Sequence, residues 1–450
     1  MTGLKNEHRS IERREYVERL AAAEGNGMVK IITGLRRCGK SHLLGVAFRK
    51  YLKERGVDDG HIHAVALDLK PWEALQEPDR LYRHFAERIK ADGKRHYVFI
   101  DEVQLCRKTL KEGATPSRTA PEDREGLYTT FHDTLNSLAA LPETDVYVTG
   151  SNSKMLSKDV ATQFRGRGME LRLRPLSFAE FLPVHGGEKA DAWEDYLAFG
   201  GLPQVVLERD ETGKRRLLES LFAKTYLRDI VERNGIRDEV AVERVADMLC
   251  SAVGSLTNPG RIANGFASVW RGKGPTEPTV RAWLGHFEDA FLFERADRWD
   301  VKGGRYLSSP SKWYSTDIGL RNARTNFRQM EPTHLMENAI YNELRGRGYA
   351  VDTGMVESVE SRGRGKQEHV RREIDFVVNT AKKRVCIQSA FAIPDEEKRR
   401  QETAALQKAG GFGRKIVVTG GNEKPWMDEN GILFVGVIPF MLDRSFVEGW

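Results

Sequence analysis

The most informative segment of this chain is Gly34-Leu35-Arg36-Arg37-Cys38-Gly39-Lys40-Ser41. It matches the pattern G-x-x-x-x-G-K-[ST], whose glycines let the backbone curl until successive N–H groups face one anion. The segment Val-Lys-Ile-Ile-Thr, residues 29–33, precedes it and is interpreted as a buried strand, and a helical segment begins at Ser41. The sequence therefore predicts a phosphate-binding loop that extends to His42. In this loop Lys40 contacts the β- and γ-phosphates of a nucleoside triphosphate, and Ser41 ligates Mg²⁺.

An acidic pair ends a second apolar run, residues 96–100. Asp101 and Glu102 follow this run directly, and open α/β sheets hold their ligands at the carboxyl ends of the strands. We expect Asp101 to hold Mg²⁺ together with Ser41. Glu102 is expected to act as the general base that orients and deprotonates the attacking water.

A third strand is predicted over residues 145–149, and it runs into Gly150-Ser151-Asn152-Ser153. A polar side chain at this point would contact the γ-phosphate or the lytic water, and Asn152 is the first choice, with Ser151 second. The alternative is a simple turn in which Ser151 or Ser153 caps a helix.

Two arginines lie between glycines in the segment Phe-Arg-Gly-Arg-Gly, residues 164–168. Such an arginine suits a finger that stabilises transition-state charge from the same or a neighbouring subunit of a homo-oligomer. Arg167 is the better candidate, with Arg165 next. A solvated basic loop explains the segment equally well, so both interpretations stay open.

These motifs resemble those of the prokaryotic AAA+-like ATPases that carry a C-terminal domain of unknown function related to PD-(D/E)xK nucleases. The resemblance spans nearly the whole chain in order. It rests on GLRRCGKS (34–41), FIDEVQ (99–104), YVTGSNSKMLSKD (147–159), FRGRG (164–168), PLSFAEF (175–181), FGGLP (199–203), GSLTNP (254–259), FRQMEPTHLMENAIYNELRGRGY (327–349), EIDFVV (373–378) and IQSAF (387–391). It implies an ATP-binding protein of bacteria or archaea.

The expected fold is α/β, in three regions. Residues 1–206 form an additional-strand P-loop ATPase domain (AAA+-like) with a parallel sheet. It has a leading helix at residues 9–23 and a further strand at 64–69 that marks the additional-strand class. Within this region, residues 107–126 form a long polar loop, interpreted as a tolerated insertion rather than a partner loop.

Residues 207–330 begin with helices and continue as helix, turn, helix and hairpin, the outline of a winged helix. In a DNA-binding version Arg281 would face a groove, while Lys302 and Arg305 would contact phosphates. Several acidic residues interrupt the basic surface that DNA binding would need. The alternative is that this region acts as a lid or as a contact between subunits.

Residues 331–450 follow the nuclease-like pattern, with Glu337 on a helix, Asp375 on a hairpin and a strand at 385–390. Gln388 stands where the pattern has an acidic ligand, and Ala390 stands where it has lysine. An amide is a poor ligand for a hard cation, and alanine carries no charge. We therefore expect a nuclease-like α/β domain without catalysis. The charged segment 358–372 is either a solvated hairpin or a phosphate-contact surface.

Composition agrees with this organisation. A chain of 450 residues is longer than a domain with a single hydrophobic core usually is, so more than one domain is expected. Its net charge of +6 permits contact with nucleic acid but does not require it. The four cysteines, far apart and without a C-x-x-C pair, indicate a reduced cytoplasmic compartment rather than a zinc ribbon or a disulfide framework. The polar N-terminus lacks a signal-peptide core, and the apolar run 432–442 is too short to span a membrane.

Three functional classes stay open. The first is an ATPase that uses ATP and Mg²⁺ to move its appended domains, with DNA as a candidate partner. The second is a slow nucleotide-dependent switch or scaffold for a protein partner, and the third is an ATP-dependent nuclease. Asp101 and Glu102 favour hydrolysis over a scaffold, whereas Gln388 and Ala390 disfavour the nuclease.

Overall fold

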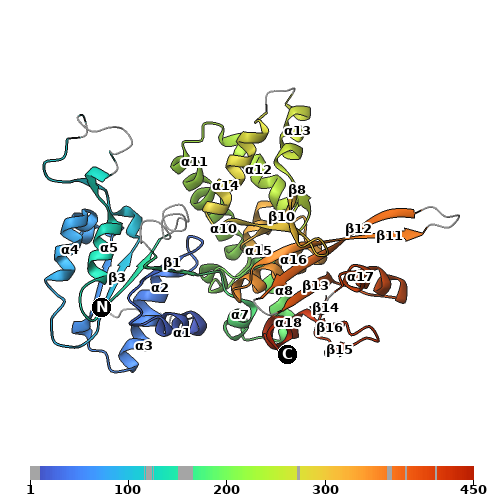
Figure 1. The fold of residues 1–450 in the computed structure, drawn as a ribbon, viewed down its shortest axis with the longest axis horizontal. Helices are drawn as coiled ribbons and strands as arrows, with labels where there is room; N and C mark the ends of the chain where they lie inside the picture. The colour runs from blue at the N-terminus through green and yellow to red at the C-terminus, as the bar shows by residue number, and fades with distance from the viewer. Residues whose placement is uncertain are drawn as a thin grey trace. The chain divides into compact units, whose positions relative to one another are not determined.

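A computed structural model describes residues 11–115, 117, 124, 126–150, 166–270, 274–361, 367–380, 383–410 and 413–449. These residues divide into two compact units, an N-terminal unit that ends at Leu173 and a C-terminal unit that begins at Arg174 (Figure 1). The predicted boundaries at residues 206 and 330 do not coincide with this division. The reason is that Phe178, Trp193 and Tyr196 belong to the hydrophobic core of the C-terminal unit.

Five parallel strands form the main sheet of the N-terminal unit among its described residues, in the order β2-β3-β6-β1-β7. They are β1 (Val29–Thr33), β2 (Ile62–Ala66), β3 (His96–Asp101), β6 (Thr144–Thr149) and β7 (Gly168–Arg172). The predicted strands at 29–33, 96–101 and 145–149 are confirmed. The strand between β1 and β3 is β6, whose residues are all buried, whereas the segment predicted at 64–69 is the half-buried edge strand β2.

Helices cover both faces of this sheet. On one face, α4 (Pro78–Ala86) and α5 (Phe131–Ala139) bury Phe85 and Leu135 against the strands. On the other, α2 (Lys40–His42), the π-helical segment η1 (Leu43–Phe48) and α3 (Arg49–Glu54) run on as one helix. The Phe48 ring lies 5.0 Å from that of Tyr147 in β6. The sheet is thus the middle of three layers, as burial on both faces requires.

The remaining elements of the N-terminal unit are short. The predicted leading helix is α1, and the predicted loop 107–126 contains part of a two-stranded hairpin, β4 with β5. Their bounds are α1 (Arg14–Ala22), η2 (Asp59–His61), η3 (Lys70–Gln76), η4 (Val103–Leu105), β4 (Thr109–Leu110) and β5 (Tyr128–Thr129).

Nine strands form the sheet of the C-terminal unit among its described residues, in the order β15-β16-β14-β13-β12-β11-β9-β10-β8. They are β8 (Leu256–Thr257), β9 (Phe293–Asp300), β10 (Arg305–Ser315), β11 (Val351–Ser361), β12 (Gln367–Asn379), β13 (Arg384–Ala390), β14 (Gly413–Thr419), β15 (Trp426–Met427) and β16 (Leu433–Gly436). The predicted hairpin around residues 302–304 is β9–β10. It is not a separate wing, because β9 also pairs in parallel with β11 and so joins residues 293–315 to the sheet of the last region.

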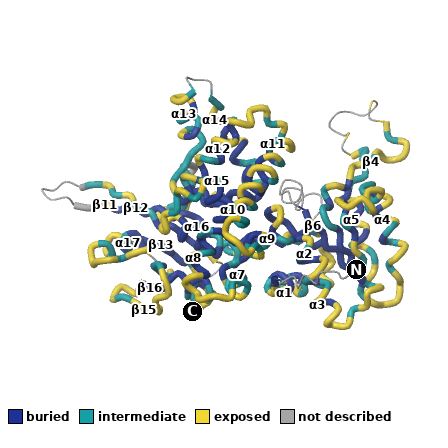
Figure 2. The backbone as a smooth tube through the Cα atoms, turned by 180° about the vertical axis from the view of Figure 1, so that it is seen from behind, coloured by how far each residue is buried: buried dark blue, intermediate teal, exposed yellow. Residues whose placement is uncertain are grey.

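Two helices cover opposite faces of this second sheet. Helix α16 (Pro332–Gly346) buries Met336 and Ile340 with Phe376 and Val418, and α17 (Glu396–Lys408) buries Leu406 on the other face. Figure 2 shows buried residues along the central strands and exposed ones on the outer faces of the helices and on the loops. Among the described residues, no helix combines the length and the apolar character needed to cross a bilayer.

The other helices of the C-terminal unit confirm that residues 207–290 are mainly helical. They are α7 (Phe178–His185), α8 (Lys189–Phe199), α9 (Pro203–Val206), α10 (Glu211–Ser220), η7 (Leu221–Leu227), α11 (Arg228–Asn234), α12 (Glu239–Ser251), α13 (Pro259–Val269), α14 (Glu277–Asp289), α15 (Ile318–Arg324), α18 (Val437–Leu442) and α19 (Ser445–Glu448).

Candidate functional site

The predicted phosphate loop leads from the buried strand β1 into helix α2. Gly34 and Gly39 have φ angles of 132° and 98°, in the region that favours glycine. A Cβ atom on Gly34 would lie 2.0 Å from the carbonyl oxygen of Leu173, so a larger residue does not fit. Between the glycines, Leu35 and Cys38 are buried, which holds the loop against the sheet.

Lys40 folds back over this loop. Its Nζ donates to the carbonyl oxygens of Gly34 at 3.0 Å and of Leu35 at 3.1 Å, and the residue is 5% exposed. Ser41, at the first turn of the helix, is exposed. The ammonium group is therefore held at the loop by two weak acceptors that a phosphate would outcompete. The donors present fit a polyphosphate.

The loop has two further cationic or titratable neighbours, Arg13 and His42. Arg13, which precedes α1, is 3% exposed, and its guanidinium donates to the Cys38 carbonyl at 3.5 Å. Burial and the charge of Arg13 lower the pKa of His42, which keeps its imidazole neutral near pH 7. Arg13 could not be predicted as a neighbour of the loop, because an arginine at the start of a leading helix is ordinary.

The acidic pair lies at the carboxyl end of β3, and Thr149 of β6 joins its two members. The backbone N–H of Glu102 donates to Thr149 Oγ1 at 3.0 Å, and the Thr149 hydroxyl donates to the carboxylate of Asp101. Glu102 has a φ angle of 52°, which is strained for a residue with a side chain. Gln104 Nε2 donates to the Glu102 carboxylate. Sequence reasoning missed Thr149 and Gln104, although Thr149 ends a strand that was predicted.

We expect Thr149→Val to lower the ATP turnover number about tenfold, because the change keeps the shape of the side chain but removes the hydroxyl that positions both acids. Nucleotide affinity should change little. The matched control is Thr144→Val at the start of the same strand, whose hydroxyl bonds only to the Pro142 carbonyl among the contacts seen. Equal turnover in the two variants would show that Thr149 does not position the pair.

The described part of the predicted arginine segment lies at the other end of the sheet. The Val29 N–H donates to the Arg167 carbonyl at 2.8 Å, and β7 pairs with β1 so that Val29 is opposite Gly168. Arg167 thus flanks the amino end of β1, whereas the phosphate loop follows its carboxyl end, roughly 16 Å along the strand. This placement excludes a finger acting within the same subunit. Ser151, Asn152 and Arg165 lie outside the described residues.

A second polar cluster lies in the C-terminal unit, around the buried Lys312 of β10. The Lys312 Nζ lies 2.9 Å from Glu337 Oε1, 2.7 Å from Glu373 Oε1 and 2.9 Å from Asp375 Oδ1, and Tyr314 Oη donates to Glu337 at 2.7 Å. Lys312 thus joins Glu337 and Asp375, the two acids of the nuclease-like pattern. Lys312 was missed, because it belongs to a strand assigned to a different region.

The charges in this cluster depend on one another. Burial alone would lower the pKa of Lys312, but the charges of Asp375, Glu337 and Glu373 raise it above its ordinary value. Burial and the charge of Asp375 raise the pKa of Glu337, against the bonds from Lys312 and Tyr314. Lys312 is therefore a permanent cation within a group of acids that its charge holds together.

The side chains of Gln388 and Ala390, the other two positions of the nuclease-like pattern, do not bond to this cluster of acids. Gln388 Nε2 donates to Glu402 Oε2 at 3.3 Å, and Ala390 is buried in the hydrophobic core. The backbone N–H of Ser389 donates to Asp375 Oδ2 at 2.9 Å.

Comparison with known proteins places these observations in a family. A family described as "AAA domain" matches residues 26–182, which include the phosphate loop and the acidic pair, and a "Domain of unknown function (DUF8612)" matches residues 190–331. An uncharacterized protein of Haemophilus influenzae is 30% identical over 416 residues, which are 91% of this chain and 93% of that protein. This chain belongs to one family with that protein, and its residues 26–182 are an AAA domain.

Two further likenesses are more distant. An uncharacterized protein of Methanocaldococcus jannaschii is 27% identical over 397 residues, 85% of this chain and 78% of that protein. Among solved structures, a Walker-type ATPase of Pyrococcus abyssi is 15% identical, covers 70% of this chain and 96% of its own, and has a TM-score of 0.47. The AAA domain thus confirms the predicted ATP-binding P-loop fold. The two matched families end at or before residue 331, so the nuclease-like assignment of residues 331–450 stays a prediction.

Proposed function

We propose that this chain is an ATPase that binds ATP with Mg²⁺ in its AAA domain and uses hydrolysis to rearrange its C-terminal unit. One observation carries the proposal. The phosphate loop after β1 and the acidic pair after β3 both lie at the carboxyl ends of strands in one parallel sheet. The Thr149 hydroxyl of the intervening strand β6 donates to the Asp101 carboxylate and accepts from the Glu102 backbone N–H. The carboxyl ends of the strands form the edge at which such sheets bind ligands.

Each residue of the site has a role under this proposal. The N–H groups of the loop and Lys40 bind the phosphates, and Lys40 exchanges the carbonyls of Gly34 and Leu35 for phosphate oxygens. Ser41 and Asp101 would hold Mg²⁺, which when bound neutralises phosphate charge. Glu102 orients and deprotonates the attacking water. We keep Asn152 as the proposed contact to the γ-phosphate.

Phosphate release by the full chain tests this function. Turnover is measured with ATP and Mg²⁺ alone, and again with single-stranded DNA, double-stranded DNA or RNA. We expect steady phosphate release, and stimulation by one nucleic acid would identify it as the partner. Tight ATP binding without release under all four conditions would contradict the ATPase and favour the slow switch.

Because Arg167 lies far from its own phosphate loop, a finger role requires a second subunit. We expect specific activity to rise with protein concentration, and a mixture of Arg167→Ala and Glu102→Gln chains to regain activity that neither has alone. Regain is expected because one mixed interface joins an intact Arg167 to an intact Glu102. No regain, with activity flat over a wide concentration range, would leave Arg167 as a structural residue.

The cluster around Lys312 argues against the nuclease alternative. Three carboxylates converge on an ammonium group, and Gln388 and Ala390 replace an acidic ligand and a cation, so these residues do not fit a catalytic Mg²⁺. We infer that this unit binds a partner rather than cleaving it.

Contact with DNA through the C-terminal unit remains part of the proposal. Of the predicted DNA contacts, Arg281 pairs with Glu277 at 2.5 Å, and Lys302 Nζ donates to the Glu357 carbonyl at 3.1 Å. Exposed pairs of this kind are weak, so both cations remain available to a stronger anion. Phosphate release measured with DNA or RNA present tests whether this contact with nucleic acid occurs.

A further inference from the structure

We propose that His61, Asp92 and His96 bind a divalent transition-metal ion of the zinc class at the edge of the AAA sheet opposite the phosphate loop. His61 ends η2, directly before β2, and His96 is the first residue of β3. These strands pair in parallel with Ile62 opposite Tyr97, so the two histidines lie side by side at the amino ends of their strands. Asp92 comes from the segment that leads into β3.

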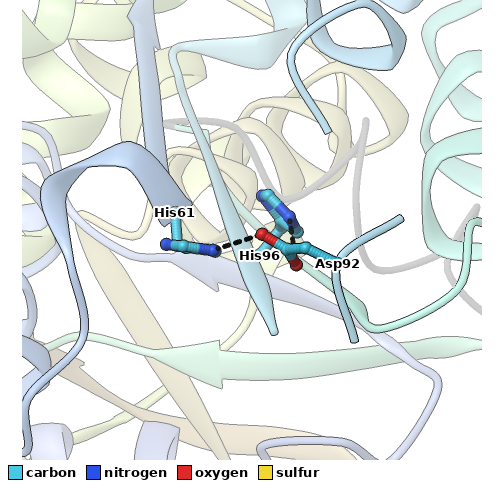
Figure 3. Close-up of side chains that lie close together, drawn as sticks. All are labelled: His61, Asp92 and His96. Atoms are coloured by element: carbon cyan, nitrogen blue, oxygen red, sulfur yellow. Dashed lines mark hydrogen bonds and ion pairs between the residues drawn. The ribbon is translucent and has the colours of Figure 1, made fainter. Parts of the chain in front are cut away.

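The ligand atoms lie at distances that suit a metal ion. His61 Nε2 is 3.0 Å from Asp92 Oδ2, His96 Nε2 is 3.7 Å from Asp92 Oδ1, and the three ligand atoms all lie within 4.8 Å of one another. Figure 3 shows both rings directed at the carboxylate. A tetrahedral ion with bonds of about 2.0–2.1 Å needs ligand atoms roughly 3.3 Å apart, so only small shifts are required.

The types of donor select the metal. Two imidazoles and one carboxylate suit zinc and its neighbours, and they are a poor set for Mg²⁺, which prefers oxygen ligands. The side chains of His61 and Asp92 are 14% and 34% exposed, whereas that of His96 is 0% exposed. An ion therefore has a path from solvent, and three protein ligands leave the fourth position to water.

A second histidine orients the buried ligand. His96 Nδ1 lies 3.0 Å from His63 Nε2, and the two rings are stacked with centroids 5.3 Å apart. When Nε2 of His96 binds a metal, its proton sits on Nδ1 and is donated to His63, which fills the role that a carboxylate, a backbone carbonyl or water commonly has beside a metal-bound histidine. Metal binding replaces the present contacts of His96 Nε2 with the Lys90 backbone, at 3.2 and 3.3 Å.

This position gives the ion a structural role. The site joins the edge strand β2 to β3, whereas the acidic pair follows the other end of β3, roughly 17 Å away along the strand. A ligand that binds only the folded chain stabilises it. The ion should therefore raise the melting temperature without taking part in ATP chemistry.

The test uses the untagged full chain, stripped with a chelator and free of nucleotide. Zn²⁺ is titrated by calorimetry, and Co²⁺ is followed by its visible absorption. We expect one ion per chain, a four-coordinate Co²⁺ spectrum and a melting temperature raised by Zn²⁺ but not by Mg²⁺. His61→Ala and Asp92→Asn, both at partly exposed positions, should each weaken binding by more than the roughly 10- to 100-fold that a lost supporting partner costs.

His84→Ala is the matched control, because His84 lies on the neighbouring helix α4 outside the three ligands, and it should bind Zn²⁺ as the wild type does. Wild-type binding that is no tighter than that of His61→Ala and Asp92→Asn would overturn the proposal. So would an unchanged melting temperature at saturating Zn²⁺. In either case the three residues form only a hydrogen-bonded cluster.

Discussion

Lys40→Ala is expected to weaken ATP binding by about 100-fold or more, because each charge-assisted hydrogen bond to a phosphate contributes about 1.5–3 kcal/mol. The fold should survive, since the loop carbonyls of Gly34 and Leu35 that Lys40 now contacts can be satisfied by water. Equilibrium titration with a fluorescent ATP analogue measures the change in affinity, and a thermal melt checks the fold.

Lys50→Ala is the matched control for this loss. Lys50 lies on α3, and its pair with Glu54, 3.8 Å apart, is exposed on both sides. Its removal should leave ATP affinity unchanged. An affinity for ATP that is the same in Lys40→Ala and Lys50→Ala would mean that the loop is not the nucleotide site.

Lys312→Met should lower the free energy of unfolding by about 3–5 kcal/mol, because it leaves Glu337, Glu373 and Asp375 without the cation that compensates their charge. The methionine side chain has a similar volume, so the loss reports charge rather than a cavity. Chemical denaturation with a probe in the C-terminal unit measures it.

The control is Lys302→Met, at the exposed turn between β9 and β10, where the loss should stay within about 0.5 kcal/mol. If the two variants unfolded at the same denaturant concentration, Lys312 would not be the cation that the cluster needs.

The sequence predicted the strands of the AAA domain well, for a physical reason. Strands β1, β3 and β6 are buried on both faces, so each is rich in apolar residues, and the buried charges of Lys30 in β1 and Asp145 in β6 pair with each other. The order of these strands in the sheet could not be predicted in the same way. The sequence predicts the additional strand at residues 64–69, yet the strand found there, β2 (Ile62–Ala66), forms the edge of the sheet, because local sequence does not encode which strands become neighbours.

Contacts between distant segments account for most of what was missed. Thr149 and Asp101 are 48 residues apart, and Lys312 and Asp375 are 63 apart, so no motif links them. The cluster of His61, Asp92 and His96 was missed for the same reason, since His61 and His96 become neighbours only when β2 pairs with β3. The loop of residues 34–42 could be predicted because its chemistry is contained in one continuous segment.

A single-turnover experiment tests whether Glu102 is the general base of ATP hydrolysis: it compares hydrolysis of bound ATP by the wild type and by Glu102→Gln, at enzyme concentrations above the dissociation constant of each. The glutamine keeps the shape of the side chain and the Thr149 bond to the backbone, but it cannot accept a proton from water. We predict that Glu102→Gln binds ATP as the wild type does and hydrolyses it roughly 10²- to 10⁴-fold more slowly. Equal rates of hydrolysis in the two proteins would contradict the account.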